Sequence, residues 1–280
     1  MSKKPFLSKL LFTLIMAMFS LAFILPLLWM ISSSLKTEFE VMSFHMKWIP
    51  DNLQWKNYIN VVTRKSYPIV RVYYNSLAVA SGTILGALLI CTTSGYAFAK
   101  LKFRGKNILF LLYLSTLMIP MQVTLIPRFY LIRAMGLYNN LLALVLPACF
   151  SAIGIFMMTQ TFKTIPKEYI ESGKIDGAGH FVIFYKLHLP LIIPSLIALS
   201  ILVFVISWSE FLNPLIFINT SAKYTLPLFL DVLMNAATGM GYQYHYSMAA
   251  GVVGTVPLVL VFIFLQRYFI ESIVVTGIKG

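Results

Sequence analysis

The feature that most constrains this chain is a set of six long runs without a single charged side chain. They cover residues 10–35, 72–99, 107–127, 134–162, 189–209 and 232–266. A helix needs about 20 predominantly apolar residues to cross the hydrocarbon core of a bilayer. Each run is long enough, so we expect one spanning helix in each, at approximately 10–31, 74–99, 107–126, 141–162, 189–210 and 248–268.

The composition agrees with a membrane protein and excludes a soluble one. Of the 280 residues, 59% are hydrophobic and only 11% are charged, whereas soluble domains carry roughly 25% charged residues. We therefore expect an all-α polytopic membrane protein with residues 1–280 forming a single transmembrane domain. The first apolar run is too long for a cleaved export signal and is expected to remain as an anchor. The pattern Gly82-x-x-x-Gly86 permits close contact with another helix, although it is common in membrane helices.

The distribution of Lys and Arg predicts the orientation, because basic connections remain in the cytoplasm. With both termini in the cytoplasm, the inner segments are 1–9, 100–106, 163–188 and 267–280, and they hold 13 of the 22 basic residues. The other nine are spread over the much longer outer connections at about 32–71, 121–140 and 211–247. The net charge of +13 favours contact between basic loops and anionic membrane lipid over contact with nucleic acid.

Catalytic motifs are absent from the sequence. It holds no Gly-x4-Gly-Lys-Ser/Thr phosphate loop, no His-Glu-x-x-His zinc pair and no Gly-x-Ser-x-Gly elbow. The four histidines fall on both sides of the predicted topology, so we expect no metal site, no catalytic residue and no cofactor bound by this chain. Cys91 and Cys149 lie inside uncharged runs and are expected to be small buried hydrophobic residues.

The inner connection at 163–188 is expected to fold. Glu168 and Glu171 suit the positive end of a helix dipole, and Gly177 provides a stop. A second short helix is expected at 181–187. Gly173 within the first helix costs about 1 kcal/mol relative to alanine, which indicates that another backbone approaches closely, as at a docking surface.

This connection carries a specific resemblance. Glu171-Ser172-Gly173, three residues, Gly177, nine residues and then Leu187-His188-Leu189-Pro190 resembles the EAA loop of permease subunits in binding-protein-dependent ABC importers. The loop's pattern is Glu-Ala-Ala, x3, Gly, x9, Ile-x-Leu-Pro. Here serine and glycine replace the two alanines, and leucine replaces isoleucine. The resemblance implies ATPase coupling by Glu168, Glu171, Ser172, Gly173, Asp176, Gly177, Leu187, Leu189 and Pro190.

A second resemblance narrows the subfamily. Trp208-Ser209-Glu210-Phe211, Tyr224-Thr225-Leu226-Pro227 and the C-terminal segment 265–280 are similar to carbohydrate permeases of the maltose type (MalG-like). This implies a six-helix subunit with the type I importer fold, paired with a homologous second permease as a heterodimer. The implied partners are an ABC ATPase dimer that holds ATP and Mg, an extracytoplasmic sugar-binding protein, and membrane lipid. The resemblance implies ATP-driven import of a sugar, with an oligosaccharide as the expected substrate, across a bacterial or archaeal inner membrane.

The residues of the substrate path are less strongly indicated. Sugar sites combine aromatic faces with amide and hydroxyl groups, and near the fifth span the candidates are Ser207, Trp208, Glu210 and Asn213. Trp208 also fits an interfacial aromatic anchor. The outer region at 211–247, with Asn235, Gln243 and His245, is expected to face the binding protein. The alternatives are an ABC importer permease for a non-sugar solute, or a secondary carrier, for which the uncharged helices offer no ion site.

Overall fold

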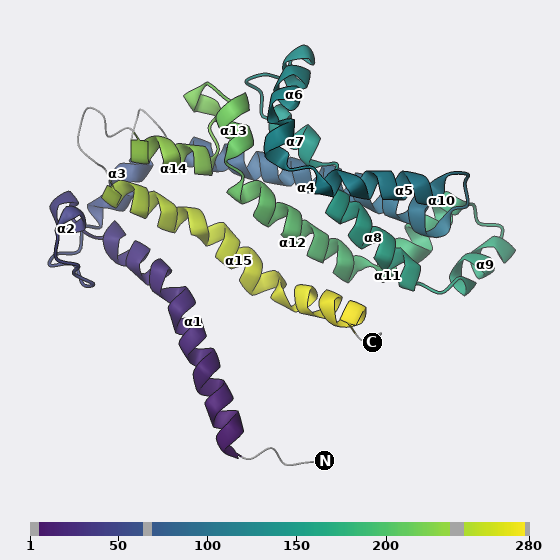
Figure 1. Cartoon of the computed structure of the whole chain (residues 1–280), viewed down its shortest axis with the longest axis horizontal. Helices are drawn as coiled ribbons and strands as arrows, with labels where there is room; N and C mark the ends of the chain where they lie inside the picture. Colours follow the sequence, from purple (N-terminus) through teal and green to yellow (C-terminus); the bar gives the residue numbers. More distant parts are fainter. Residues whose placement is uncertain (1–5, 64–68, 236–243, 278–280) are drawn as a thin grey trace. The chain divides into compact units, whose positions relative to one another are not determined.

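The computed structural model describes residues 6–63, 69–235 and 244–277, with side chains over 8–63, 69–234 and 244–267. Every regular element in these ranges is a helix (Figure 1). The chain divides into two compact units. Unit 1 comprises Met1–Val70 and Phe229–Val256, and unit 2 comprises Arg71–Leu228 and Pro257–Gly280. An all-helical membrane fold, as expected from the apolar runs, is confirmed.

Three helices are each long and apolar enough to cross a membrane alone. They are α1 (Phe6–Ser34), α4 (Ile69–Lys100) and α15 (Tyr244–Gly277). The last begins at Tyr244, earlier than the expected start near residue 248. His245 and Ser247 are buried within unit 1, so these polar residues extend a packed helix instead of forming a loop. Asn235 and Gln243, expected to face a binding protein, lie outside the residues with described side chains.

The run expected to span the membrane at 107–126 is divided by a sharp bend. Helix α5 (Lys106–Ser115) continues through a 3₁₀ turn at Thr116–Met118, and α6 (Met121–Ala134) then leaves at 105°. Pro120 sits at the break. A proline disfavours helical backbone in the residue before it, and Ile119 is extended, with φ −87° and ψ 116°. The pair is therefore a broken span or a re-entrant segment.

Two further pairs are bent at short breaks. Helix α7 (Leu142–Ala148) precedes α8 (Ala152–Thr164) at 41°, and the hydroxyl of Ser151 caps α8 by accepting from the Gly154 amide at 3.1 Å. A continuous helical segment from His180 to Leu191 precedes α12 (Ile193–Ser209) at 78°. Counting each bent pair as one span raises the total to as many as six, the expected number. The exact limits of the spans stay a prediction.

Helices α4, α8 and α12 form the main core of unit 2 around Met158, Phe162 and Leu199. Glycines let their backbones approach closely. A Cβ on Gly95 would lie 2.5 Å from the Met158 Cβ, and one on Gly86 would lie 2.2 Å from the Cys149 sulfur. Gly154 likewise makes room for Cys91, because a Cβ on Gly154 would lie 2.7 Å from the Cys91 sulfur. Both cysteines are free and buried, as predicted, and Gly82 and Gly86 make their close contacts with residues of this chain.

A second core in unit 2 lies beside the segments that follow α12. These are α13 (Leu212–Phe217), a 3₁₀ turn at Ser221–Lys223 and the first residues of α14 (Leu226–Asn235). Buried Asn75 of α4 donates to the carbonyls of Ala222 and Tyr224, at 3.0 and 2.9 Å. These two bonds hold the connection between α13 and α14 against α4.

Unit 1 contains a polar junction after α1. Here α2 (Glu38–Met42) begins with a capping box formed by Thr37 and Glu40, and α3 (Lys56–Thr63) follows after a loop. Lys36 is only 1% exposed, and its ammonium lies 4.1 Å above the Trp29 ring and donates to the Lys47 carbonyl. Burial lowers the pKa of Lys36, partly offset by the charge of Glu40. The junction is thus held by buried polar contacts.

Candidate functional site

The segment that carries the EAA-like pattern is folded into two short helices at the end of unit 2 (Figure 1). Helix α9 (Glu168–Ile175) has Glu168 and Glu171 in its first turn, where carboxylates oppose the helix dipole favourably. The helix ends before Gly177, whose φ of 76° lies in the left-handed region that favours glycine. The second helical segment, from His180 to Leu191, consists of α10 (His180–Val182), a π-helix at Ile183–His188 and α11 (Leu189–Leu191).

Gly173 is the contact point between these two helices. It is buried, and a Cβ there would lie 3.0 Å from both Ile183 Cγ1 and Leu187 Cδ1. The sequence had suggested that the small residue admits another backbone at a docking surface. Instead, the close approach occurs within the loop, because the following helix folds back onto α9. Gly173 therefore sets the spacing of the two helices, and it is not part of an exposed face.

The polar residues of α9 remain exposed. Glu168, Glu171, Ser172 and Asp176 are all solvent-accessible, and the Ser172 hydroxyl donates to the Tyr169 carbonyl at 3.3 Å. Among the described residues, none of the three carboxylates lies within 4.0 Å of a basic side chain. These acidic groups are therefore available to a basic partner residue.

The second helix of the loop is anchored in the core by His188. Its side chain is fully buried, contacts the rings of Tyr96 and Phe162 at centroid distances of 5.5 and 6.2 Å, and pairs through Nδ1 with the Ile183 carbonyl at 3.2 Å. Leu187 and Leu189 beside it are partly buried, and Pro190 is exposed. Since Tyr96 belongs to α4 and Phe162 to α8, His188 connects the second helix of the loop to both of these helices.

Lys100 makes a second attachment between the loop and α4. In the sequence, its positive charge indicated only the orientation of the chain in the membrane. The ammonium of Lys100, the last residue of α4, donates to the Ile165 carbonyl at 2.6 Å. Ile165 directly follows α8 and opens the loop. The helical spans are therefore tied to the loop at its start by Lys100 and at its end by His188.

Three of the four candidate substrate residues share one cavity in unit 2. Ser207, Glu210 and Asn213 line a hollow of about 230 Å³ together with Arg128 of α6. The fourth candidate, Trp208, does not line it. It is 2% exposed and packs against Tyr73 and Phe204, at ring distances of 5.6 and 5.4 Å. Trp208 faces the opposite side of α12 because successive residues of a helix point in different directions.

Arg128 is the principal residue of this cavity that sequence reasoning missed. Its guanidinium donates to the Asn213 side-chain oxygen at 3.4 Å and to the Thr124 hydroxyl at 3.5 Å. The Glu210 carboxylate accepts a hydrogen bond from the backbone N–H of Asn213 at 3.1 Å. In the sequence, Arg128 is a single arginine directly after the uncharged run at 107–127. It was therefore assigned to the outer connection at 121–140 and not to the substrate path. The bend at Pro120 brings it to α12, and the cavity thus combines a cation, an anion and hydroxyl or amide groups suited to a hydroxylated solute.

Comparisons with known proteins agree on one assignment. Residues 82–275 match the family model described as binding-protein-dependent transport system inner membrane component. The chain is 36% identical over 282 residues to the arabinooligosaccharides transport system permease protein AraQ of Halalkalibacterium halodurans, covering 99% of this chain and 98% of that protein. It is 30% identical over 270 residues to AraQ of Bacillus subtilis, covering 96% and 95%.

The fold also matches a solved structure. A chain from the crystal structure of a bacterial ABC transporter involved in the import of the acidic polysaccharide alginate superposes with a TM-score of 0.82. The match covers 96% of this chain and 99% of that chain at 20% sequence identity. At this identity, the likeness shows a shared fold.

Proposed function

The chain belongs to the family of binding-protein-dependent transport system inner membrane components, and we propose that it forms half of the translocation path of an ATP-driven sugar importer. It is a non-catalytic permease subunit of an ABC importer. The sugar class is supported by the relatives named for arabinooligosaccharide transport. It is also supported by the cavity in which Ser207, Glu210, Asn213 and Arg128 supply polar groups between apolar walls.

The observation that carries the coupling mechanism is the attachment of an exposed acidic helix to the membrane core. Helix α9 presents Glu168, Glu171 and Asp176 outward, while Gly173 packs onto the segment that His188 anchors between α4 and α8. In the proposed mechanism, α9 docks in a cleft of a separate ATPase subunit. Closure of the ATPase dimer on ATP and Mg then moves α9 and, through His188 and Lys100, reorients α4 and α8.

The proposed assembly has this chain paired with a homologous second permease. The ATPase dimer lies on the cytoplasmic side with both termini of this chain, and an extracytoplasmic sugar-binding protein delivers the substrate. The separation of roles agrees with a sequence that lacks a phosphate-binding loop. The predicted coupling loop at 163–188 contributes Glu171 as the partner of a basic ATPase residue, Gly177 as the turn, and Gly173 as the spacer inside the loop.

Two substitutions test the coupling role. Glu171→Lys reverses the charge that we assign to the ATPase contact, and Gly177→Asp places a charged side chain at the end of α9. Both are expected to abolish sugar uptake and reduce ATPase copurification while the chain still inserts into the membrane. Normal uptake and copurification in both variants would contradict the proposal.

Each substitution has a matched control in the chain. Gly136 also has a positive φ, 70°, and open space around its Cβ position, as does Gly177. Gly136→Asp therefore introduces the same strain and charge outside the loop and should retain ATPase copurification and uptake. Glu38→Lys, in the first turn of α2, repeats the charge reversal in unit 1. If these controls fail equally, the effect belongs to folding and not to the loop.

The cavity is tested through transport kinetics. Arg128→Gln removes the cation that faces Asn213. We expect the KM for sugar uptake to rise by about tenfold, because one charge-assisted hydrogen bond to the sugar is lost. Arg133→Gln is the control, since Arg133 is exposed on the same helix and does not line the cavity. An unchanged KM with Arg128→Gln would remove this cavity from the substrate path.

A further inference from the structure

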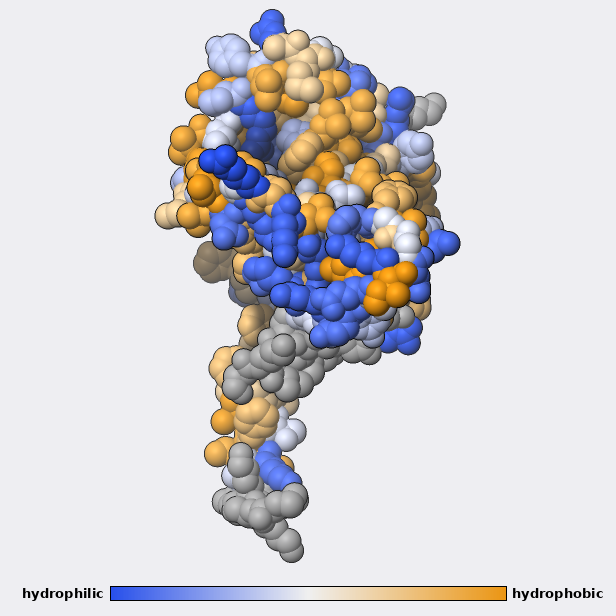
Figure 2. Space-filling model, turned by 90° about the vertical axis from the view of Figure 1, so that its right-hand side faces the viewer, coloured by the Kyte–Doolittle hydropathy of each residue, from blue (hydrophilic) through white to orange (hydrophobic). Residues whose placement is uncertain are grey.

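A strongly basic hollow lies between the turn that joins α4 to α5 and the coupling loop. Its volume is about 890 Å³, and all of its lining residues belong to unit 2. The charged residues that line it are one glutamate, Glu171, and six lysines: Lys100, Lys102, Lys106, Lys163, Lys167 and Lys174. Figure 2 looks onto this end of unit 2 and shows hydrophilic residues gathered in a band across it. We call this site the basic hollow.

The carboxylates of the chain balance only part of the positive charge of the basic hollow, since Glu171 is the one carboxylate among its lining residues and Glu168 acts on Lys100 from a distance. Within the described part of the protein, none of the six lysines lies within 4.0 Å of a carboxylate. Lys100 and Lys106 donate to the carbonyls of Ile165 and Leu101, at 2.6 and 3.0 Å. These bonds fix two ammonium groups at the site without cancelling their charge. Clustered like charges repel one another, so the arrangement favours binding of an anion.

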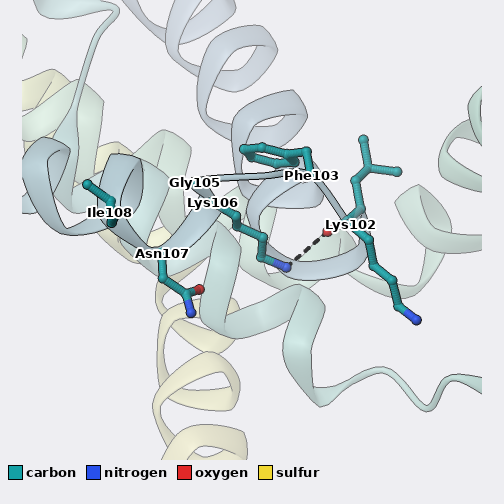
Figure 3. Close-up of a pocket in the computed structure, with 7 residues that line it drawn as sticks. Lys102, Phe103, Gly105, Lys106, Asn107 and Ile108 are labelled. Atoms are coloured by element: carbon teal, nitrogen blue, oxygen red, sulfur yellow. Dashed lines mark hydrogen bonds between the residues drawn. The ribbon is translucent and has the colours of Figure 1, made fainter.

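An apolar surface adjoins the basic hollow on one side. A smaller hollow of about 520 Å³, lined by residues of the segment 101–108, shares Lys102, Phe103 and Lys106 with it. Figure 3 shows Lys102 on the turn that precedes α5, and Lys106 and Ile108 on the first turn of that helix. Phe103 is 42% exposed and Ile108 is 66% exposed. The exposed apolar surface continues along α5 through Leu112, within a segment that is apolar enough to form part of a membrane span.

We propose that the basic hollow binds the phosphate group of an anionic phospholipid. Lys102 and Lys106 would contact the phosphate, and the acyl chains would lie along Ile108 and Leu112 of α5. Basic pockets at the cytoplasmic ends of membrane helices are suited to such headgroups. A free phosphate would satisfy the lysines but would leave the apolar side of the site uncovered. The assignment to the cytoplasmic leaflet rests on the proposed orientation of the chain.

The basic hollow would connect the binding of anionic lipid to the position of the coupling loop. Lys163, Lys167 and Lys174 of the basic hollow belong to the coupling loop, and Lys163 also lies 5.8 Å from the Phe110 ring centroid of α5. A phosphate bound among these lysines screens their mutual repulsion and holds the loop beside the α4–α5 turn. Anionic lipid should therefore stabilise the position from which α9 engages the ATPase.

The test measures lipid binding directly on the assembled transporter. The complex is purified in detergent and titrated separately with phosphatidylglycerol, phosphatidylcholine and inorganic phosphate, and binding is followed by native mass spectrometry and thermal stability. We expect retained phosphatidylglycerol and a raised melting temperature, with little effect of the other two probes. Equal stabilisation by inorganic phosphate would overturn the lipid assignment. If phosphatidylcholine bound as well as phosphatidylglycerol, the net negative charge of the lipid would not determine binding and the proposal would be refuted.

Charge-removing and charge-retaining variants locate the site. Each basic side chain near anionic lipid adds roughly fivefold in affinity, so the double variant Lys102→Gln/Lys106→Gln should bind phosphatidylglycerol about 30-fold more weakly. Lys102→Arg/Lys106→Arg should retain binding, which excludes a folding defect at these positions. Lys56→Gln, an exposed lysine of unit 1, is the matched control. Unchanged affinity in the Gln/Gln variant, or an equal loss in Lys56→Gln, would refute the proposal. None of these measurements requires sugar transport, so their outcome is independent of the proposed function.

Discussion

Replacing Gly95 with alanine should separate the two helices on which the coupling loop is mounted. A Cβ at Gly95 would lie 2.5 Å from the Met158 Cβ, 2.9 Å from the Met158 carbonyl carbon and 3.0 Å from the Thr159 nitrogen. Non-bonded carbons rest at about 3.5–4.0 Å. Two of the three atoms are backbone and cannot rotate away, so α4 and α8 must move apart locally by about 1 Å.

The free-energy cost follows from two opposing effects. Overpacking a well-filled core costs about 1–3 kcal/mol, and the upper end applies here because the obstructing atoms are backbone. Alanine recovers about 1 kcal/mol of helix propensity relative to glycine. We expect a net destabilisation of about 2 kcal/mol, which lowers the melting temperature by roughly 4–8 °C. Uptake should also fall, because the Lys100–Ile165 hydrogen bond depends on the same spacing.

The assay is thermal unfolding of the purified complex in detergent, together with sugar uptake in cells. Gly179→Ala is the control, since Gly179 has φ −71° and no atom within 4 Å of its Cβ position. The Gly179→Ala variant should have the same melting temperature as the wild type. If Gly95→Ala also melts with the wild type, the close contact between α4 and α8 is not limiting and the reasoning is refuted.

Three further predictions concern the polar junctions. Lys36→Met should destabilise unit 1 by about 2–3 kcal/mol, because a cation–π contact and a charge-assisted hydrogen bond are lost; thermal unfolding measures it, with Lys56→Met as the control. The backbone amides of Thr37 and, next, Asp51 lower the pKa of Glu40 below its usual 4.5. This stabilisation is present above pH 4.5 and is lost as the pH falls through the lowered pKa. Hydrogen exchange of residues 37–51 should therefore lose protection on acidification, and Glu40→Gln should remove that pH dependence. Asn75→Ala leaves two carbonyls without a donor and should cost about 2 kcal/mol in an unfolding assay, whereas exposed Asn52→Ala should cost nothing measurable.

The membrane class and the folding of the segment at 163–188 were predictable because they depend on local sequence. A run of apolar residues long enough to cross a bilayer has few other stable environments. The loop was recognisable from the spacing of Glu171, Gly177 and Pro190 along the chain. The positive φ at Gly177 and the helix that precedes it follow from local backbone preferences. These features require no knowledge of distant contacts.

The remaining features depend on packing between distant segments. Proline marked the position of the bend between α5 and α6, but a bend of 105° depends on the neighbours of α6. The burial of Trp208 and the access of Ser207 to the cavity are set by the face that α12 presents to α4 and α6. Likewise, the sequence identified Gly173 as a site of close approach. It did not reveal that the partner is the helical segment at 180–191.

The burial of both native thiols makes the chain suited to chemical labelling. Cys91 and Cys149 are sealed against glycines in the core of unit 2, so a polar maleimide should leave the folded wild type unmodified. A cysteine placed at exposed Ser172 or at exposed Asp51 would then be the reactive group without prior removal of the native ones. Applied to intact cells, an impermeant reagent would separate the two sides of the membrane, and spectroscopic probes at the same positions would report the movement of α9 during the ATPase cycle.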